Sequence, residues 1–138
     1  MAVGGFVKKI RDIMRMDAGI SGDAQRIEQL VWILFLKVYD SKEENWEFDD
    51  DEYESIIPEE CRWRNWAEDQ SLTGDKLLDF VNNKLFPTLK NLQVNAETPI
   101  KKSIILSTFE DANNYMNDGV YLRQIINVVN EIDFEDTK

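Results

Sequence analysis

Histidine is absent from this 138-residue chain, and cysteine occurs only once, as Cys61. Without histidine, neither a Ser-His-Asp triad nor a Cys-His pair can be built, and the usual Cys/His zinc sites are excluded. A single cysteine also rules out a disulfide within the chain, which fits a reducing cytoplasm. We therefore predict a cytoplasmic protein with no catalytic residue and no metal site in this chain.

Glycine-rich loops and long apolar runs are missing as well. Gly4-Gly5 does not belong to a phosphate-binding motif, so no cofactor site is predicted. The run Leu30–Leu36 is bounded by Gln29 and Lys37 and is far shorter than the ~18 apolar residues of a membrane span. The N-terminal segment carries charges where a secretory signal would be apolar. We expect neither a membrane segment nor secretion.

Positive charge is scarce, with 16 Lys and Arg against 27 Asp and Glu and a formal net charge of −11. Phosphates would repel such a chain, so autonomous nucleic-acid binding is not expected. Residues 43–60 contain ten acids and no base, and we interpret them as a long exposed loop held by Trp46, Phe48 and Tyr53. The acidic run 49–52 lacks the spacing and glycine of a calcium loop, which favours a solvated loop over a cation site.

Apolar residues, by contrast, are plentiful at 43% of the chain, and they recur at spacings of three and four. No segment alternates for long enough to predict a strand. Helices are predicted at residues 3–16, 23–40, 75–92, 99–109 and 119–133. The predicted fold is a single all-α domain over 1–138. It is a helical bundle of about five main helices around the buried central helix 23–40, with the long acidic loop.

The central helix is apolar on more than one side. Its predicted buried stripe consists of Ile27, Leu30, Val31, Leu34, Phe35 and Val38. Additional apolar side chains lie outside that stripe, namely Trp32, Ile33, Leu36 and Tyr39. Several neighbours should therefore cover this helix.

The other helices have simpler patterns. Pro87 should kink or interrupt helix 75–92, and Thr98-Pro99 should cap helix 99–109. The side chains predicted to be buried in these segments are Leu77, Val81, Leu85, Leu89, Leu92, Ile100, Ile104, Ile105, Phe109, Leu122, Ile125, Ile126, Val129 and Ile132.

Two groups of basic residues are candidate contacts to DNA or to a partner protein. They are Lys8, Lys9, Arg11 and Arg15 in the first helix, and Arg62 and Arg64 in the segment RWRNW. For the first group, an ordinary solvated helix face is favoured over phosphate contact in the isolated chain. For the second group, we favour a structural role, in which the two tryptophans close the core and the arginines lie at their rim. The alternative is a platform that stacks on bases or on a partner.

Seven stretches in order along nearly the whole chain carry a family resemblance. They are FVKKIRDIMRMDAGI (6–20), GDAQRIEQL (22–30), FLKVYD (35–40), RWRNWA (62–67), TGDKLLDFVNNKLFPTL (73–89), DGVYLRQII (118–126) and NEIDF (130–134). Together they resemble the start of the modification (M) subunit of type I restriction-modification systems. No single stretch is a catalytic signature, but the ensemble is specific.

The resemblance implies a parent protein that transfers a methyl group from S-adenosylmethionine to the N6 of adenine. Its partners would be a specificity subunit, a restriction subunit, a second modification subunit and double-stranded DNA. A helical N-terminal domain precedes the methyltransferase domain in this family and is associated with subunit contacts and closure around DNA.

This chain lacks the family's Asn-Pro-Pro motif, since Pro58, Pro87 and Pro99 are never adjacent. We therefore expect an inactive N-terminal fragment whose native chain continues past Lys138. The alternative is a free-standing interaction or regulatory protein derived from this domain, such as a DNA mimic.

Overall fold

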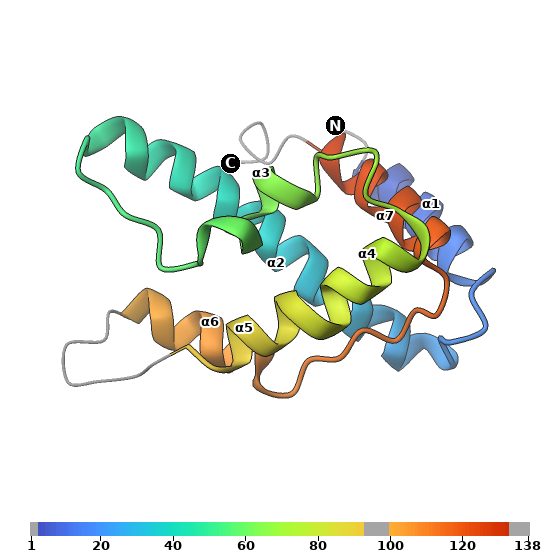
Figure 1. Cartoon of the computed structure of the whole chain (residues 1–138). Helices are drawn as coiled ribbons and strands as arrows, with labels where there is room; N and C mark the ends of the chain where they lie inside the picture. The colour runs from blue at the N-terminus through green and yellow to red at the C-terminus, as the bar shows by residue number, and fades with distance from the viewer. Residues whose placement is uncertain (1–2, 93–99, 133–138) are drawn as a thin grey trace.

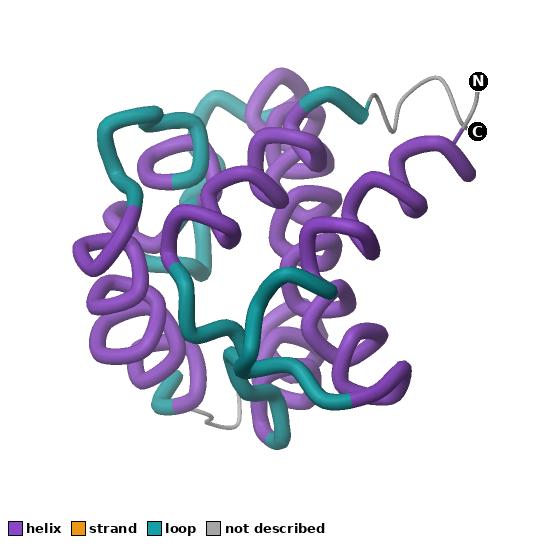
Figure 2. Tube along the Cα trace, turned by 90° about the vertical axis from the view of Figure 1, so that its right-hand side faces the viewer, coloured by secondary structure: helices purple, strands orange, loops and turns teal. Residues whose placement is uncertain are grey.

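The structure, a computed structural model, describes residues 3–92 and 100–132 (Figure 1). Its elements are α1 (Val3–Met14), α2 (Gly22–Asp49), η1 (Glu59–Cys61), α3 (Trp63–Trp66), α4 (Gly74–Phe80), η2 (Val81–Leu85), α5 (Phe86–Lys90), α6 (Ile100–Glu110) and α7 (Gly119–Asn130). Within the described ranges every regular element is helical, which confirms the predicted all-α class. In Figure 2 helix makes up most of the described tube, and loops join the helix ends.

The long helix α2 runs diagonally through the molecule (Figure 1). Helix α7 packs against α1, α2 and α4, and α5 packs against α6. Because α4, η2 and α5 follow one another without a break, the described residues form five main helical segments together with the short η1 and α3. The prediction of about five main helices is confirmed.

The buried face of α2 differs from the one predicted. Ile27 is 64% exposed and Val31 is 53% exposed, whereas Trp32, Ile33 and Leu36 are at most 1% exposed. The residues that the prediction put outside the main stripe therefore form the core face of α2, together with Gln29, Tyr39, Asp40 and Glu43. The sequence run is apolar all round, so helical spacing fits both faces and tertiary packing decides between them.

The prediction of an acidic loop over 43–60 is wrong for its first seven residues, because α2 continues to Asp49. Acidic side chains near a helix C-terminus oppose the helix dipole. Here Glu43 and Glu47 instead form ion pairs with Arg62, which offsets that cost. Trp46 and Tyr53 do hold the shorter loop, with ring centroids 5.9 Å apart, but Phe48 is 88% exposed and holds nothing.

The third predicted helix is interrupted as Pro87 suggested. A π-helical segment, η2, separates α4 from α5, and Pro87 lies in the first turn of α5. A proline removes one backbone donor and crowds the preceding turn, and a π turn is one way for the helix to adapt. Four of the five predicted core residues here, Leu77, Val81, Leu85 and Leu89, have no exposed surface, and Leu92 is half-buried.

The last two helices match the prediction to different extents. In α6, Ile105 and Phe109 are fully buried, but Ile100 and Ile104 are 78% and 49% exposed, so that part of the prediction is wrong. All predicted core residues of the last helix are buried, although Ile132 lies just beyond the end of α7. The predicted cap Thr98-Pro99 lies outside the described residues.

A buried carboxylate joins the two ends of the fold. Asp17, 3% exposed, follows α1 and accepts hydrogen bonds from the backbone N–H groups of Gly19, Asn117 and Asp118, at 2.7, 3.0 and 2.9 Å. Asp118 in turn caps α7, accepting from the N–H groups of its first turn. The turn after α1 is thus fixed to the start of α7.

Candidate functional site

The exposed face of α1 carries most of the predicted basic contacts. Lys8, Arg11 and Arg15 recur at spacings of three and four, so they project from one side of the helix, while Lys9 lies about 100° further round. Asp12 shares this side. Its carboxylate lies 3.1 Å from Lys8 Nζ and 4.0 Å from an Arg15 guanidinium nitrogen. One acid against three bases leaves this face of α1, the α1 basic face, positively charged.

The side chains of the α1 basic face are exposed enough to bind phosphate. The side chains of Lys8 and Arg15 are 71% and 58% exposed. Ion pairs as exposed as these contribute about 0–1 kcal/mol, so a phosphate could displace Asp12 at small cost. Within a chain of net charge −11, this is a local excess of basic side chains.

The second predicted pair of contacts, Arg62 and Arg64, is engaged inside the chain. Arg62 lies 3.5 Å from Glu43 and 2.8 Å from Glu47. Arg64 lies 3.0 Å from Asp40 and 2.8 Å from Glu47. The two arginine side chains are only 7% and 27% exposed. They fix the segment after the acidic loop onto α2, and their role as DNA contacts stays a prediction.

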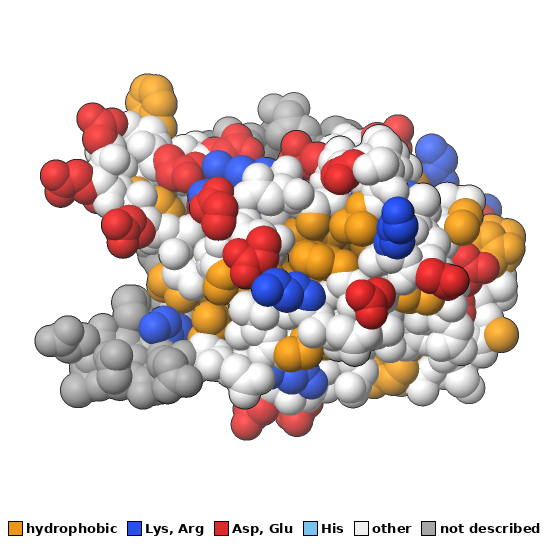
Figure 3. All heavy atoms as spheres, viewed as in Figure 1, with side chains coloured by type: hydrophobic (Ala, Val, Ile, Leu, Met, Phe, Trp, Pro, Cys, Tyr) orange, Lys and Arg blue, Asp and Glu red, His pale blue; other side chains and the backbone are white. Residues whose placement is uncertain are grey.

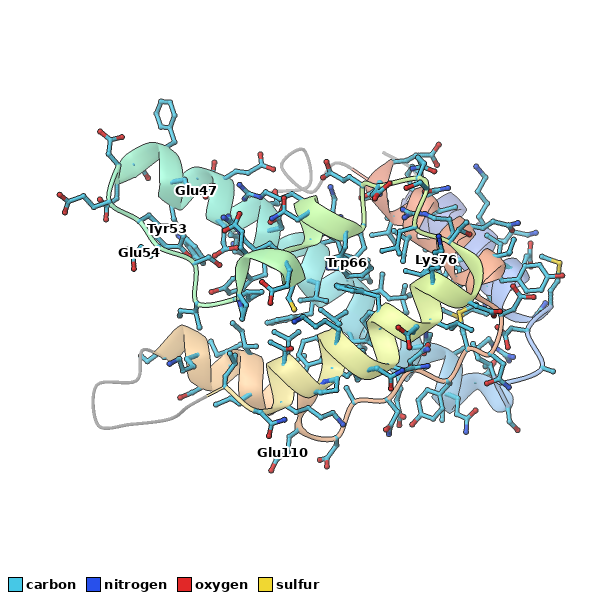
Figure 4. All side chains as sticks on the ribbon, in the orientation of Figure 1. Glu47, Tyr53, Glu54, Trp66, Lys76 and Glu110 are labelled. Atoms are coloured by element: carbon cyan, nitrogen blue, oxygen red, sulfur yellow. The ribbon has the colours of Figure 1, made fainter. Side chains whose placement is uncertain are left out.

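A tyrosine extends this ion-pair network, and the contacts of the network shift the pKa values of its members. Hydrogen bonds from Arg62 and Arg64 lower the pKa of Glu47. Tyr53 donates a 2.7 Å hydrogen bond to Glu43, and burial together with that bond raises the pKa of Tyr53. In Figure 4, Glu47 lies on α2 and Tyr53 on the loop that follows this helix. At neutral pH Glu47 is therefore ionised and Tyr53 protonated, which keeps the network intact.

Trp63 and Trp66 belong to the core, as the favoured interpretation of RWRNW predicted. They are 1% and 2% exposed, and their ring centroids are 5.3 Å apart. Each indole N–H has an internal acceptor: Trp63 donates to the Asn130 side chain and Trp66 to the Cys61 carbonyl. Figure 4 shows Trp66 in the interior between α3 and α4. Neither ring is available to stack on a base.

Acidic side chains dominate the end of α2 and the loop that follows it (Figure 3). Even so, no group of three or more His, Cys, Asp or Glu in the described ranges could hold a metal ion. Burial raises the pKa of the Cys61 thiol, so this cysteine is a poor nucleophile. Among the described helices, none is both long and apolar enough to cross a membrane.

Two shallow apolar depressions flank α2. One, of about 270 Å³, lies between α1 and α2 and is lined by Val7, Ile10, Arg11, Met14, Asp23, Arg26, Ile27 and Leu30. The other, of about 300 Å³, lies between α2 and α6 and is lined by Phe35, Val38, Tyr39, Lys42, Trp46 and Ile104. The linings suit apolar protein side chains better than a charged small molecule.

A helical bundle with an exposed basic face, a tightly paired acidic helix end and apolar depressions has the character of an interaction domain. The chain belongs to the HsdM N-terminal domain family, whose sequence model matches residues 3–129. The resemblance to the modification subunits of type I restriction-modification systems is thereby confirmed.

Relatives of known identity agree with this family. The type I restriction enzyme EcoEI methylase subunit of Escherichia coli is 48% identical over 139 aligned residues, which cover 100% of this chain and 28% of that protein. A modification subunit assigned to a type I restriction enzyme of Vibrio vulnificus YJ016 superposes with a TM-score of 0.89 at 33% identity, over 95% of this chain and 30% of that one.

A second solved structure comes from work on complex assembly and conformational transition in the type I restriction-modification system. It superposes with a TM-score of 0.81 at 33% identity, over 97% of this chain and 26% of that one. The chain therefore spans less than a third of each of these relatives.

Proposed function

We propose that this chain is the N-terminal assembly domain of a modification subunit that acts as a site-specific DNA adenine-N6 methyltransferase. The observation that carries the proposal is 48% identity along the entire chain to 28% of a methylase subunit. The native chain would continue past Lys138 into a methyltransferase domain that binds S-adenosylmethionine. Residues 1–138 would supply no catalytic or cofactor-binding group, and the complex would work in the cytoplasm.

The partners in this proposal are a specificity subunit, a restriction subunit, a second modification subunit and double-stranded DNA. Support comes from the similarity to a chain studied for complex assembly of a type I system. The α1 basic face would approach the DNA backbone once other subunits supply further positive charge. No observation favours the alternative of a free-standing regulatory protein.

The complete reading frame tests this proposal. Its product, purified with the specificity subunit, should transfer labelled methyl groups from S-adenosylmethionine to adenine in DNA, measured by scintillation counting and nucleoside mass spectrometry. Residues 1–138 alone should transfer none above background. A stop codon soon after Lys138, or methyl transfer by the purified 1–138 chain, would contradict it.

The α1 basic face makes a separate prediction. Replacing Lys8 and Arg11 with glutamate in the full complex should weaken DNA binding at low salt. The slope of log K against log salt concentration should fall by roughly one for each phosphate that the variant no longer neutralises. Fluorescence anisotropy titrations between low and moderate salt would measure both quantities.

A matched control is available outside α1. Lys76 in α4 and Lys84 in η2 are exposed, and changing both to glutamate alters the net charge by the same amount. The control should leave the salt slope unchanged. If both double variants shift the slope equally, the effect is one of overall charge, and the α1 basic face is an ordinary solvated surface.

A further inference from the structure

Helix α2 carries an apolar stripe on the side opposite its core face. Ile27, Val31, Leu34 and Val38 follow one another at spacings of four, three and four, which keeps them on one side of the helix. Ile27 and Val31 are 64% and 53% exposed, whereas Leu34 and Val38 are partly buried, and Leu34 also packs against the core. We call these four residues the outer stripe of α2.

The outer stripe belongs to a wider apolar surface. The depression between α1 and α2 borders one end of it, and the depression between α2 and α6 borders the other. Exposed apolar residues extend it on both sides, with Val7 on α1 at 41% and Ile104 on α6 at 49%. Single exposed apolar side chains are normal on a protein surface, but a contiguous set across three helices marks a surface that another element covers.

Basic side chains border this apolar surface although the chain as a whole is strongly acidic. Arg11 and Arg26 line the depression beside α1, where Arg26 also contacts Asp23, and Lys42 lines the one beside α6. An apolar stripe offers nothing to a phosphate backbone. It matches an apolar protein segment whose own rim is acidic.

We propose that the outer stripe of α2 is the docking surface for the methyltransferase domain of the same polypeptide, an inference that rests on the proposed function. More than two thirds of the E. coli relative lies outside the part that this chain matches. A domain tethered to this one is present at an effective concentration of about millimolar. Such a tether lets an interface of modest area, about 600–1,500 Å² between domains of one chain, remain closed.

With the methyltransferase domain docked on the outer stripe, α2 takes part in two interfaces. Its inner face, with Trp32, Ile33 and Leu36, holds the core of this domain, and its outer stripe faces the next domain. A single rigid helix of 28 residues would thus be shared between two hydrophobic interfaces. Movement of the N-terminal domain relative to the catalytic domain would require the outer stripe to separate.

Thiol accessibility in the complete subunit tests the proposal. Val31 is replaced with cysteine in one variant and Phe48 in another; both positions lie on α2, and both are exposed here, at 53% and 88%. Each variant reacts with a maleimide, and mass spectrometry of the α2 peptide gives the labelling rate. We expect the thiol at position 31 to react at least about tenfold more slowly than the thiol at position 48. In urea the two rates should become similar.

Three outcomes separate the possibilities. Slow labelling at position 31 in a subunit shown to be monomeric by light scattering supports docking within one chain, and Ile27→Cys should give the same protection. Protection that appears only as subunit concentration rises would assign the stripe to a second copy and overturn the proposal. Rapid labelling at position 31 at every concentration would also overturn it. A reading frame that ends near Lys138 would instead defeat the proposed function itself.

Discussion

Replacing Gly119 with alanine should destabilise the domain by about 3 kcal/mol, near the upper end of the usual cost of overpacking. Gly119 opens α7 and lies directly against Gly74, the first residue of α4. An added Cβ would fall 2.8 Å from the Gly74 Cα and closer still to its carbonyl oxygen. The obstacle is backbone, which cannot rotate away as a side chain can. The two helices would have to separate, which would disturb the core between α4 and α7.

Urea unfolding monitored by circular dichroism would measure this loss, with Gly5→Ala as the matched control. Gly5 lies in α1, and a Cβ there would meet nothing within 4 Å. The same change at Gly5 should therefore be neutral or stabilise by about 0.5–1 kcal/mol, through helix propensity. Equal effects at both positions would show that the close approach of α4 and α7 does not hold in solution.

Replacing Arg62 with methionine should destabilise the domain by about 3–5 kcal/mol, the usual cost of breaking a buried ion pair from one side. The side chain of Glu43 is 1% exposed and would lose the charge that compensates it. Glu47 would lose its 2.8 Å partner as well, although Arg64 would remain bound to it. The end of α2 and the segment after the loop would then separate more readily.

A double-mutant cycle distinguishes the pair from its parts. Glu43→Leu combined with Arg62→Met removes both charges. The double variant should therefore be more stable, by about 1–3 kcal/mol, than the sum of the two single-variant losses predicts. The exposed pair Lys8–Asp12 on α1 serves as control, and its cycle should give a coupling of about 0.5 kcal/mol. A coupling for Glu43 and Arg62 no larger than this control would mean that solvent screens the network.

The helices themselves were predictable because their signals are local. The ends of α1, α6 and α7 lie within a few residues of the predicted ones, and Pro87 marked the interruption before α5. The orientation of α2 was not predictable in the same way. Its centre is apolar all round, so the choice of core face depends on helices that are distant in sequence.

The ion-pair network was also only partly predictable from the sequence. Asp40, Glu43 and Glu47 are spaced by three and four residues, which places them on one side of a helix. That spacing was a usable sign that α2 continues through the acidic stretch. Their pairing with Arg62 and Arg64, however, spans 15 to 24 residues and depends on how the chain folds back. Sequence alone could mark these arginines as contact residues but could not choose the partner.

The residues of the candidate site were likewise predictable only where helical spacing decides their position. Lys8, Arg11 and Arg15 share one face of α1 because helical spacing alone puts them there. Lys9 does not share it, as the same spacing could have indicated. The outer stripe of α2 was already present in the sequence, but its residues were assigned to the core, because spacing alone does not show which of two apolar faces other helices cover.

The carboxylate of Asp17 has a consequence for the order in which the chain becomes stable during synthesis. Its backbone donors at Asn117 and Asp118 lie about a hundred residues downstream. Since a ribosome adds about 5–20 residues per second, α1 leaves the exit tunnel several seconds before the donors that fix the turn after it exist. Until then Asp17 can accept a hydrogen bond from its local donor, the Gly19 N–H, but none from the start of α7. The contact between the turn after α1 and the start of α7 can therefore form only after Asn117 and Asp118 have been synthesised.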